Sequence, residues 1–111
     1  MIKTVLIAGI TGQDGYYLTK KLKQKKFKII GLSRKKKSNR DANLILKTNY
    51  TELDLIKIIR KFKPSIIFNF AGESNPQTSW QNPLSKQNSI TRINLNFINA
   101  IIKTNKKIRY F

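Results

Sequence analysis

The chain has 111 residues, of which 40% are hydrophobic, and this length and composition fit one small domain with its own core. It has no cysteine and no histidine, which excludes disulfides, thiolate chemistry and zinc–cysteine sites and removes the usual metal ligand and general base. No apolar run approaches the roughly 18 to 20 residues that span a bilayer, and the first strand leaves no room for a secretory signal. We therefore expect a cytoplasmic protein with no membrane partner.

The net charge of +18 comes from 23 Lys and Arg against 5 Asp and Glu, so the surface potential is strongly positive. The lysines are spread along the whole chain, and many fall where the polar faces of helices are expected. No nucleic-acid-binding motif is present. We interpret the charge mainly as a solvated surface that helps to attract an anionic nucleotide, and we rank a nucleic-acid partner well below this.

Strands and helices alternate along the chain. The apolar run Thr4–Ala8 predicts a buried parallel strand, and a helix is expected over residues 13–25. Further strands are expected over 27–32, 44–46 and 65–70 and from 108 onward; further helices are expected after Thr51, which can cap the first turn, and over 85–103. This order predicts an α/β fold, a doubly wound parallel sheet of the Rossmann type that ends at its fifth strand.

Three glycines at intervals of three follow the first strand, in the segment Gly9-Ile10-Thr11-Gly12-Gln13-Asp14-Gly15. Strand, glycines and helix stand in the order that a nucleotide-phosphate cradle requires. We expect Gly9 to allow the tight turn and Gly12 to let the backbone approach a pyrophosphate. Gly15 would let the helix pack closely on the strand. An ordinary glycine-rich turn is the alternative that we rank lower.

Doubly wound sheets bind ligands at the carboxyl ends of their strands, where the strand order reverses. The loops over 9–15, 33–37 and 70–74 would meet there. The second strand ends in Ser33-Arg34-Lys35, with no acidic residue to bind a ribose 2′-hydroxyl. Because cations there would neutralise a 2′-phosphate, we favour NADP over NAD as the cofactor. The alternative is that these are loop cations of a lysine-rich protein.

The glycine segment with its Gln13-Asp14 pair resembles the opening of GDP-mannose 4,6-dehydratases, which belong to the extended short-chain dehydrogenase/reductase superfamily. Related nucleotide-sugar epimerases share the three glycines but usually lack that pair. The segments 31–34, 69–74 and 79–80 also resemble that family. The resemblance runs the length of the chain and covers about the first third of a complete dehydratase. It implies that residues 1–111 are an incomplete NAD(P)-binding domain without the substrate domain.

The resemblance also implies which residues would contact NADP. These are Gly9, Thr11, Gly12, Gln13, Asp14, Gly15, Tyr16, Arg34, Phe70, Ala71, Gly72, Glu73 and Ser74. The complete enzyme, a lyase and a homo-oligomer, would act on GDP-mannose or another nucleotide sugar. It would take a hydride from C4, lose water across C5–C6 and return the hydride to C6. Its catalytic Tyr-x-x-x-Lys segment lies beyond the fifth strand, so we assign no catalytic residue here.

Tyr16 and Lys20 have the Tyr-x-x-x-Lys spacing, and so do Tyr17 and Lys21. We interpret both pairs as helix surface, because this helix would open at the pyrophosphate, far from the nicotinamide. Two alternative functions stay open: a non-catalytic dinucleotide-binding module and a basic nucleic-acid-binding protein.

We further expect the strand over 65–70 to lack its neighbour. The helix over 85–103 would also lack part of the surface that buries Ile93, Phe97 and Ile101. Such an exposed hydrophobic edge promotes aggregation, so we expect the chain alone to be poorly soluble and inactive.

Overall fold

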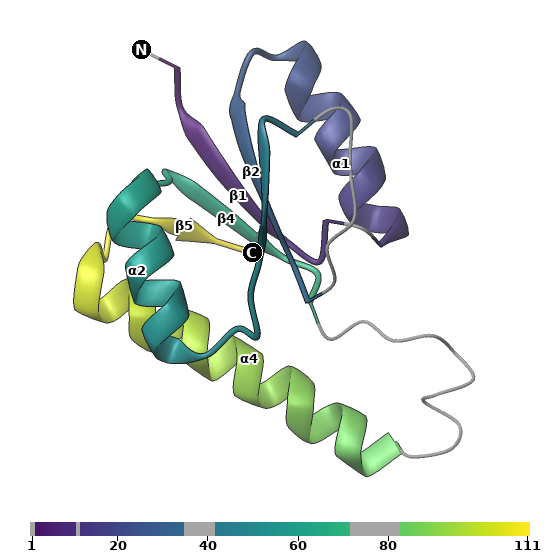
Figure 1. The fold of residues 1–111 in the computed structure, drawn as a ribbon, viewed down its shortest axis with the longest axis vertical. Helices are drawn as coiled ribbons and strands as arrows, with labels where there is room; N and C mark the ends of the chain where they lie inside the picture. The colour runs from purple at the N-terminus through teal and green to yellow at the C-terminus, as the bar shows by residue number, and fades with distance from the viewer. Residues whose placement is uncertain (1, 11, 35–41, 72–82) are drawn as a thin grey trace.

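The computed structural model describes residues 2–10, 12–34, 42–71 and 83–111 (Figure 1). Among them, the strands are β1 (Thr4–Ala8), β2 (Lys28–Ser33), β3 (Leu44–Lys47), β4 (Ile66–Asn69) and β5 (Arg109–Tyr110). The helices are α1 (Gln13–Gln24), α2 (Glu52–Phe62) and α4 (Pro83–Thr104). All strand pairs are parallel and the sheet order is β3-β2-β1-β4-β5, which confirms the predicted doubly wound sheet.

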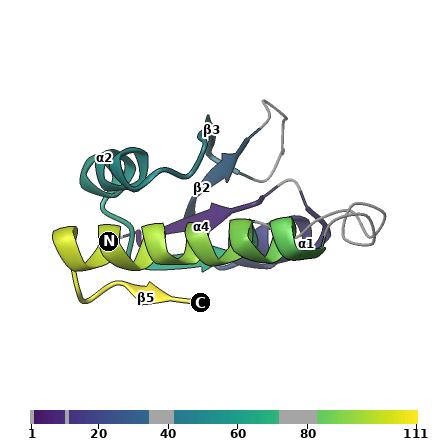
Figure 2. The same cartoon turned by 90° about the horizontal axis from the view of Figure 1, so that it is seen from below.

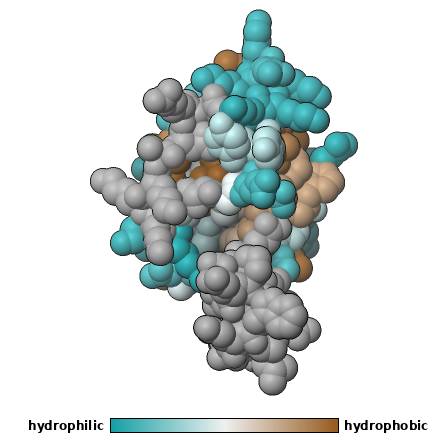
Figure 3. Space-filling model, turned by 90° about the vertical axis from the view of Figure 1, so that its right-hand side faces the viewer, coloured by the Kyte–Doolittle hydropathy of each residue, from teal (hydrophilic) through white to brown (hydrophobic). Residues whose placement is uncertain are grey.

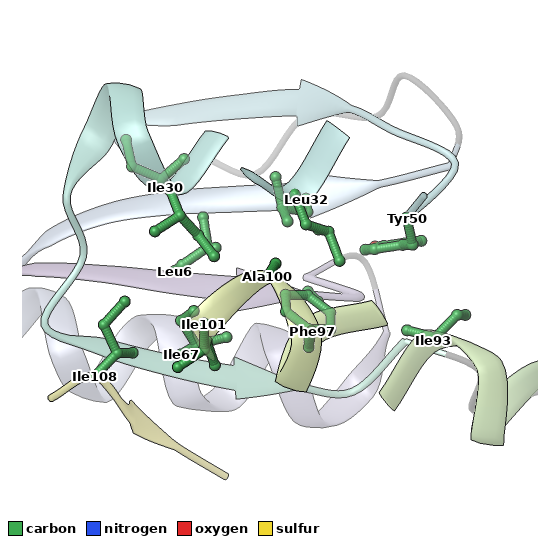
Figure 4. Close-up of a cluster of buried hydrophobic side chains, with 13 residues drawn as sticks. Leu6, Ile30, Leu32, Tyr50, Ile67, Ile93, Phe97, Ala100, Ile101 and Ile108 are labelled. Atoms are coloured by element: carbon green, nitrogen blue, oxygen red, sulfur yellow. The ribbon is translucent and has the colours of Figure 1, made fainter. Parts of the chain in front are cut away.

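The two faces of the sheet are covered by different helices, as the alternation of side chains along a strand requires. Val5 and Ile7 of β1 belong to a cluster with Leu22 of α1. Leu6 and Ala8, one residue on in each case, belong to a larger cluster that includes residues of α2 and α4 (Figure 4). These four residues of β1 are fully buried. The continuous apolar run that predicted a buried parallel strand is therefore explained by burial on both faces.

Local sequence sets both ends of α2. The Thr51 hydroxyl accepts a hydrogen bond from the backbone N–H of Asp54 at 3.2 Å, which confirms the predicted cap. At the other end Lys63 adopts a left-handed conformation with φ of 49°. Pro64 follows it, and the residue before a proline is disfavoured in the helical region. The helix therefore ends at Phe62, directly before this pair.

The expectation that β4 lacks a neighbour is wrong. Ile66 and Ile67 of β4 are in parallel register with Arg109 and Tyr110 of β5. Backbone hydrogen bonds join the two segments, from Arg109 N to Ser65 O at 3.1 Å, from Phe111 N to Ile67 O at 2.9 Å and from Asn69 N to Phe111 O at 2.9 Å. Arg109 and Phe111 make all three of these bonds on the β5 side, so residues 109–111 form the ladder.

The expected exposure of Ile93, Phe97 and Ile101 on α4 is also wrong, because all three are buried. They pack on β-sheet residues and on α2, which lies against α4 (Figure 2). Among residues 91–104 of α4, whose burial the structure describes, a different set of large apolar residues faces solvent. Leu95, Ile98 and Ile102 are 53%, 42% and 54% exposed.

Charged and polar side chains cover much of the remaining surface. The face turned to the viewer in Figure 3 is hydrophilic over its upper part, where the carboxyl-terminal end of α1 lies. Between α2 and α4, Lys103 and Glu52 form an ion pair at 2.8 Å, and this partner lowers the pKa of Glu52. No helix in the described ranges has the length and apolarity to cross a membrane.

Candidate functional site

The carboxyl ends of β1, β2 and β4 lie side by side at one edge of the sheet. The strand order reverses at β1, which has β2 on one side and β4 on the other. Backbone bonds hold them together: Gly9 N donates to Leu32 O at 3.0 Å, and Phe70 N donates to Ala8 O at 2.9 Å. In doubly wound sheets this position, where β1 has β2 on one side and β4 on the other, is where ligands bind. The glycine turn lies there, as predicted.

Gly9 allows the tight turn that the sequence predicts. Its φ is +72°, in the left-handed region that favours glycine. A Cβ at this position would lie 2.7 Å from the carbonyl carbon of Phe70 and 2.8 Å from the nitrogen of Ala71. The turn therefore brings the backbone after β1 directly against the backbone after β4. Any side chain at residue 9 would push these two segments apart.

Gly15 and Gly12 differ in what surrounds them. A Cβ at Gly15 would lie 2.8 Å from Gly9 O and 2.8 Å from the Cα of Ile10, so close helix–strand packing requires this glycine. A Cβ at Gly12 would find only Gly9 O, at an ordinary 3.4 Å. The fold among the described residues therefore has room for a side chain at Gly12, which leaves its exposed backbone open to a ligand.

The amino-terminal end of α1 is a suitable anion site. Gly12 is the N-cap residue and provides no side-chain hydrogen bond to the first turn. The first N–H groups of a helix have no partner within it, and the helix dipole places partial positive charge there. Gln13 and Asp14 in this turn are exposed, as is Tyr16. A phosphate at this end would meet backbone donors that the helix itself does not use.

Arg34 follows β2 at the same edge of the sheet and is exposed. Its guanidinium carbon lies 5.9 Å from the ring centroid of Tyr50, and the Tyr50 hydroxyl accepts a hydrogen bond from Gly9 N at 3.0 Å. Burial raises the pKa of Tyr50, although the bond from Gly9 and the charge of Arg34 oppose this rise. Sequence reasoning missed Tyr50, because a single aromatic residue between a strand and a helix cap has no periodic pattern.

A second polar cluster, also missed, fixes the backbone after β4. The Asn69 side chain donates to Asn94 Oδ1 at 2.9 Å and to the Tyr110 hydroxyl at 2.8 Å, and it accepts from Ala71 N at 2.9 Å. Tyr110 also donates to Asn94, and burial raises the pKa of Tyr110. One side chain thus ties β4, β5 and α4 together and orients Ala71, one of the predicted contact residues.

Tyr16 and Lys20 lie together on the outer surface of α1, with the Lys20 ammonium 4.6 Å from the Tyr16 ring centroid. Tyr16 is 44% exposed and Tyr17 is 60% exposed. This placement agrees with their interpretation as helix surface.

The structure brings together most of the predicted contact residues. Gly9, Gly12, Gly15, Phe70 and Ala71 are joined by the backbone contacts described above, and Arg34 reaches the same turn through Tyr50. Thr11, Gly72, Glu73 and Ser74, and the lysines after Arg34, lie outside the described residues.

Curated relatives with similar sequences are GDP-mannose 4,6-dehydratases. The enzyme of Cricetulus griseus is 34% identical over 95 residues, which cover 70% of this chain and 26% of the relative. That of Vibrio cholerae serotype O1 is 29% identical over 97 residues, covering 73% of this chain and 26% of the relative. The aligned part thus spans about a quarter of the length of these relatives.

Solved structures share the fold at low sequence identity. The UDP-glucose 4-epimerase from Brucella ovis, solved in complex with NAD, superimposes with a TM-score of 0.79 at 16% identity. This match covers 95% of this chain and 33% of that one. The Thermotoga maritima enzyme of the same name, solved with UDP-glucose, gives a TM-score of 0.77 at 20% identity over 90% of this chain and 34% of that one.

The sequence model of the NAD dependent epimerase/dehydratase family matches residues 5–111, nearly the whole chain. This match includes the glycine turn, the end of β2 and all five strands of the sheet. The chain belongs to the NAD dependent epimerase/dehydratase family.

Proposed function

We propose that this chain is the dinucleotide-binding part of a nucleotide-sugar dehydratase and that it binds NADP. The observation that carries the proposal is the contrast at the glycine turn. Gly9 and Gly15 are required by packing, whereas a Cβ at Gly12, the N-cap of α1, would meet only Gly9 O among the described residues. Packing does not require a glycine at position 12. Backbone without a side chain there is suited to close approach by a pyrophosphate.

The residues present fit the cofactor on both of its charged groups. The first turn of α1 would bind the pyrophosphate through backbone N–H groups. Arg34 would bind a 2′-phosphate by charge-assisted hydrogen bonds, and this contact favours NADP over NAD. When bound, the nicotinamide supplies the hydride acceptor for the reaction. The part of this chain is to hold and orient the dinucleotide along the carboxyl edge of the sheet.

The substrate class follows from the relatives. The two relatives described above are GDP-mannose 4,6-dehydratases, and the Gln13-Asp14 pair resembles that group more than the epimerases. We therefore propose GDP-mannose as the substrate of the complete protein, with another nucleotide sugar as the alternative. We assign Tyr16 and Lys20 no catalytic role, and their place on the exposed face of α1 supports this assignment.

The binding assignment is tested by substituting Gly12. Its backbone angles, φ of −77° and ψ of 171°, are extended and suit a β-branched residue. Gly12→Val should abolish NADP binding in calorimetry and leave the far-ultraviolet circular dichroism nearly unchanged. Gly12→Ser, which adds a smaller side chain that also caps helices well, is the matched control for folding. Equal NADP affinity in the wild type and Gly12→Val would overturn the assignment.

The cofactor preference is tested by Arg34→Ala. A charge-assisted contact to phosphate contributes about 1.5–3 kcal/mol, so NADP affinity should fall by that amount while NAD affinity changes little. Lys28→Ala, which removes an exposed cation at the opposite end of β2, is the matched control and should affect neither cofactor. Equal losses for NADP and NAD in Arg34→Ala would show that Arg34 is a general surface cation.

Because we assign no catalytic residue within these 111 residues, we expect the chain alone to be inactive. Incubation of the 111-residue chain with GDP-mannose and NADP+ should yield no 4-keto product, because no acid–base pair has been assigned within it. Product formation would contradict this, and loss of that activity in Tyr16→Phe would then identify the α1 surface pair as catalytic.

A further inference from the structure

Tyr50 is the residue through which Arg34 and the glycine turn are connected. Its side chain is 2% exposed. Its hydroxyl meets Gly9 N at 3.0 Å, and Gly9 N also donates to Leu32 O at 3.0 Å. Figure 4 shows the ring at the end of the large core cluster toward which the strand arrows point. The ring therefore lies between the core and the candidate site.

The ring is held on several sides. Tyr50 N donates to Thr48 Oγ1 at 3.1 Å, and Asn96 of α4 donates to the Tyr50 carbonyl at 2.9 Å. The Phe97 ring packs on it with centroids 6.2 Å apart and a tilt of 48°. The backbone φ of Tyr50 is +60°, which is uncommon for a bulky residue and persists only where the surroundings enforce it. These contacts make the ring a fixed surface.

The guanidinium of Arg34 lies over this fixed surface. Its carbon is 5.9 Å from the ring centroid, within the range of an attractive cation–π contact. An arginine side chain loses rotamer entropy when it binds a ligand. A ring that already restricts the guanidinium reduces this loss, and the planar guanidinium can stack on an aromatic face while its N–H groups point to a phosphate.

We propose that Tyr50 is a positioning residue for cofactor selection: its anchored ring holds Arg34 in place for the 2′-phosphate of NADP. Tyr50 acts through Arg34 and contacts no phosphate itself. The inference rests on the proposed function, since it requires that the dinucleotide binds at the glycine turn. It explains why a tyrosine with a left-handed backbone lies beneath an exposed arginine at this edge of the sheet.

A double-mutant cycle tests this coupling. Calorimetry would give the ratio of NADP to NAD affinity for the wild-type chain, Tyr50→Leu, Arg34→Ala and the double variant. A cation–π contact of this kind corresponds to a roughly 2- to 5-fold effect. Tyr50→Leu should therefore lower the ratio about 2- to 5-fold, through NADP alone. In the Arg34→Ala background the same substitution should leave the ratio unchanged.

Tyr17→Leu is the matched control, because Tyr17 is an exposed tyrosine of α1 whose ring packs edge-on against Tyr16. It should leave the ratio unchanged. If Tyr50→Leu lowers NADP and NAD affinity equally, or lowers the ratio equally with and without Arg34, Tyr50 is only structural and the inference is overturned.

A shape-conserving pair of variants covers the case in which Tyr50→Leu does not fold. Tyr50→Phe keeps the ring, and Gly9 N keeps its bond to Leu32 O. Pentafluorophenylalanine at position 50 has nearly the same shape but a ring that no longer attracts a cation. The fluorinated variant should show a ratio about 2- to 5-fold below that of Tyr50→Phe. Equal ratios would overturn the inference.

The same data separate the two proposals. If the wild-type chain binds neither dinucleotide, the proposed function fails and this inference fails with it. If it binds both and the ratio does not depend on Tyr50, only this inference fails.

Discussion

The glycine turn over residues 9–15 and the segment over residues 48–54 both lie after a strand at the same edge of the sheet, but they are built differently. The first is shaped by backbone that side chains would obstruct, at Gly9 and Gly15. The second is held by side chains, through the hydrogen bonds of Thr48, Tyr50 and Thr51. The glycine turn that we propose as a binding surface is thus supported by a neighbouring segment that is fixed by its side chains.

The largest effect should come from Gly9→Ala. The left-handed φ costs roughly 1–2 kcal/mol for a residue with a Cβ, and overpacking against Phe70 and Ala71 adds roughly 1–3 kcal/mol. We expect the free energy of unfolding in urea to fall by about 2–5 kcal/mol. Gly12→Ala, the matched control in the same turn, should cost no more than about 1 kcal/mol, the loss of a good N-cap residue. Equal losses would remove the distinction between the two glycines.

The segment over residues 48–54 is tested at Thr51, the N-cap residue of α2. Thr51→Ala removes the acceptor for Asp54 N, so the free energy of unfolding should fall by about 1 kcal/mol. Thr51→Ser keeps an oxygen in the same place and should restore nearly all of it. If the alanine and serine variants have the same stability, the cap contributes nothing to α2.

The smallest effect concerns alkaline pH. Burial raises the pKa of Tyr50 above that of an unfolded tyrosine, so the folded state retains the phenol proton to higher pH than the unfolded state. Stability contributed by this group is complete below pH ~10 and is lost as pH rises from there. Tyr50→Phe should therefore weaken the decline of unfolding free energy above pH ~10.

The same contrast explains what the sequence could predict. The strand–glycine–helix order and the Thr51 cap are local patterns, and the structure has both. Tyr50 meets Gly9 across 41 positions and Asn69 meets Tyr110 across the same separation. Such contacts depend on which segments the fold brings together, and no short motif encodes them.

The errors about β4 and α4 have a related cause. The sequence showed apolar residues at 93, 97 and 101 but not that α2, together with the existing strands, would be enough to bury them. Likewise, only the sheet register reveals that residues 109–111 reach Ser65, Ile67 and Asn69. The true solvent-exposed stripe, at Leu95, Ile98 and Ile102, is displaced by one or two positions from the predicted one.

In the proposed function, the amino-terminal turn of α1 binds the pyrophosphate of NADP. Amide chemical-shift mapping by ¹H–¹⁵N NMR during titration with NADP tests it most directly, because it reports on each backbone N–H separately. We expect the largest shifts at Gly12, Gln13, Asp14 and Gly15, with a smaller group around Arg34. Shifts confined to the lysine-rich carboxyl-terminal end of α1, with the glycine turn unmoved, would contradict it.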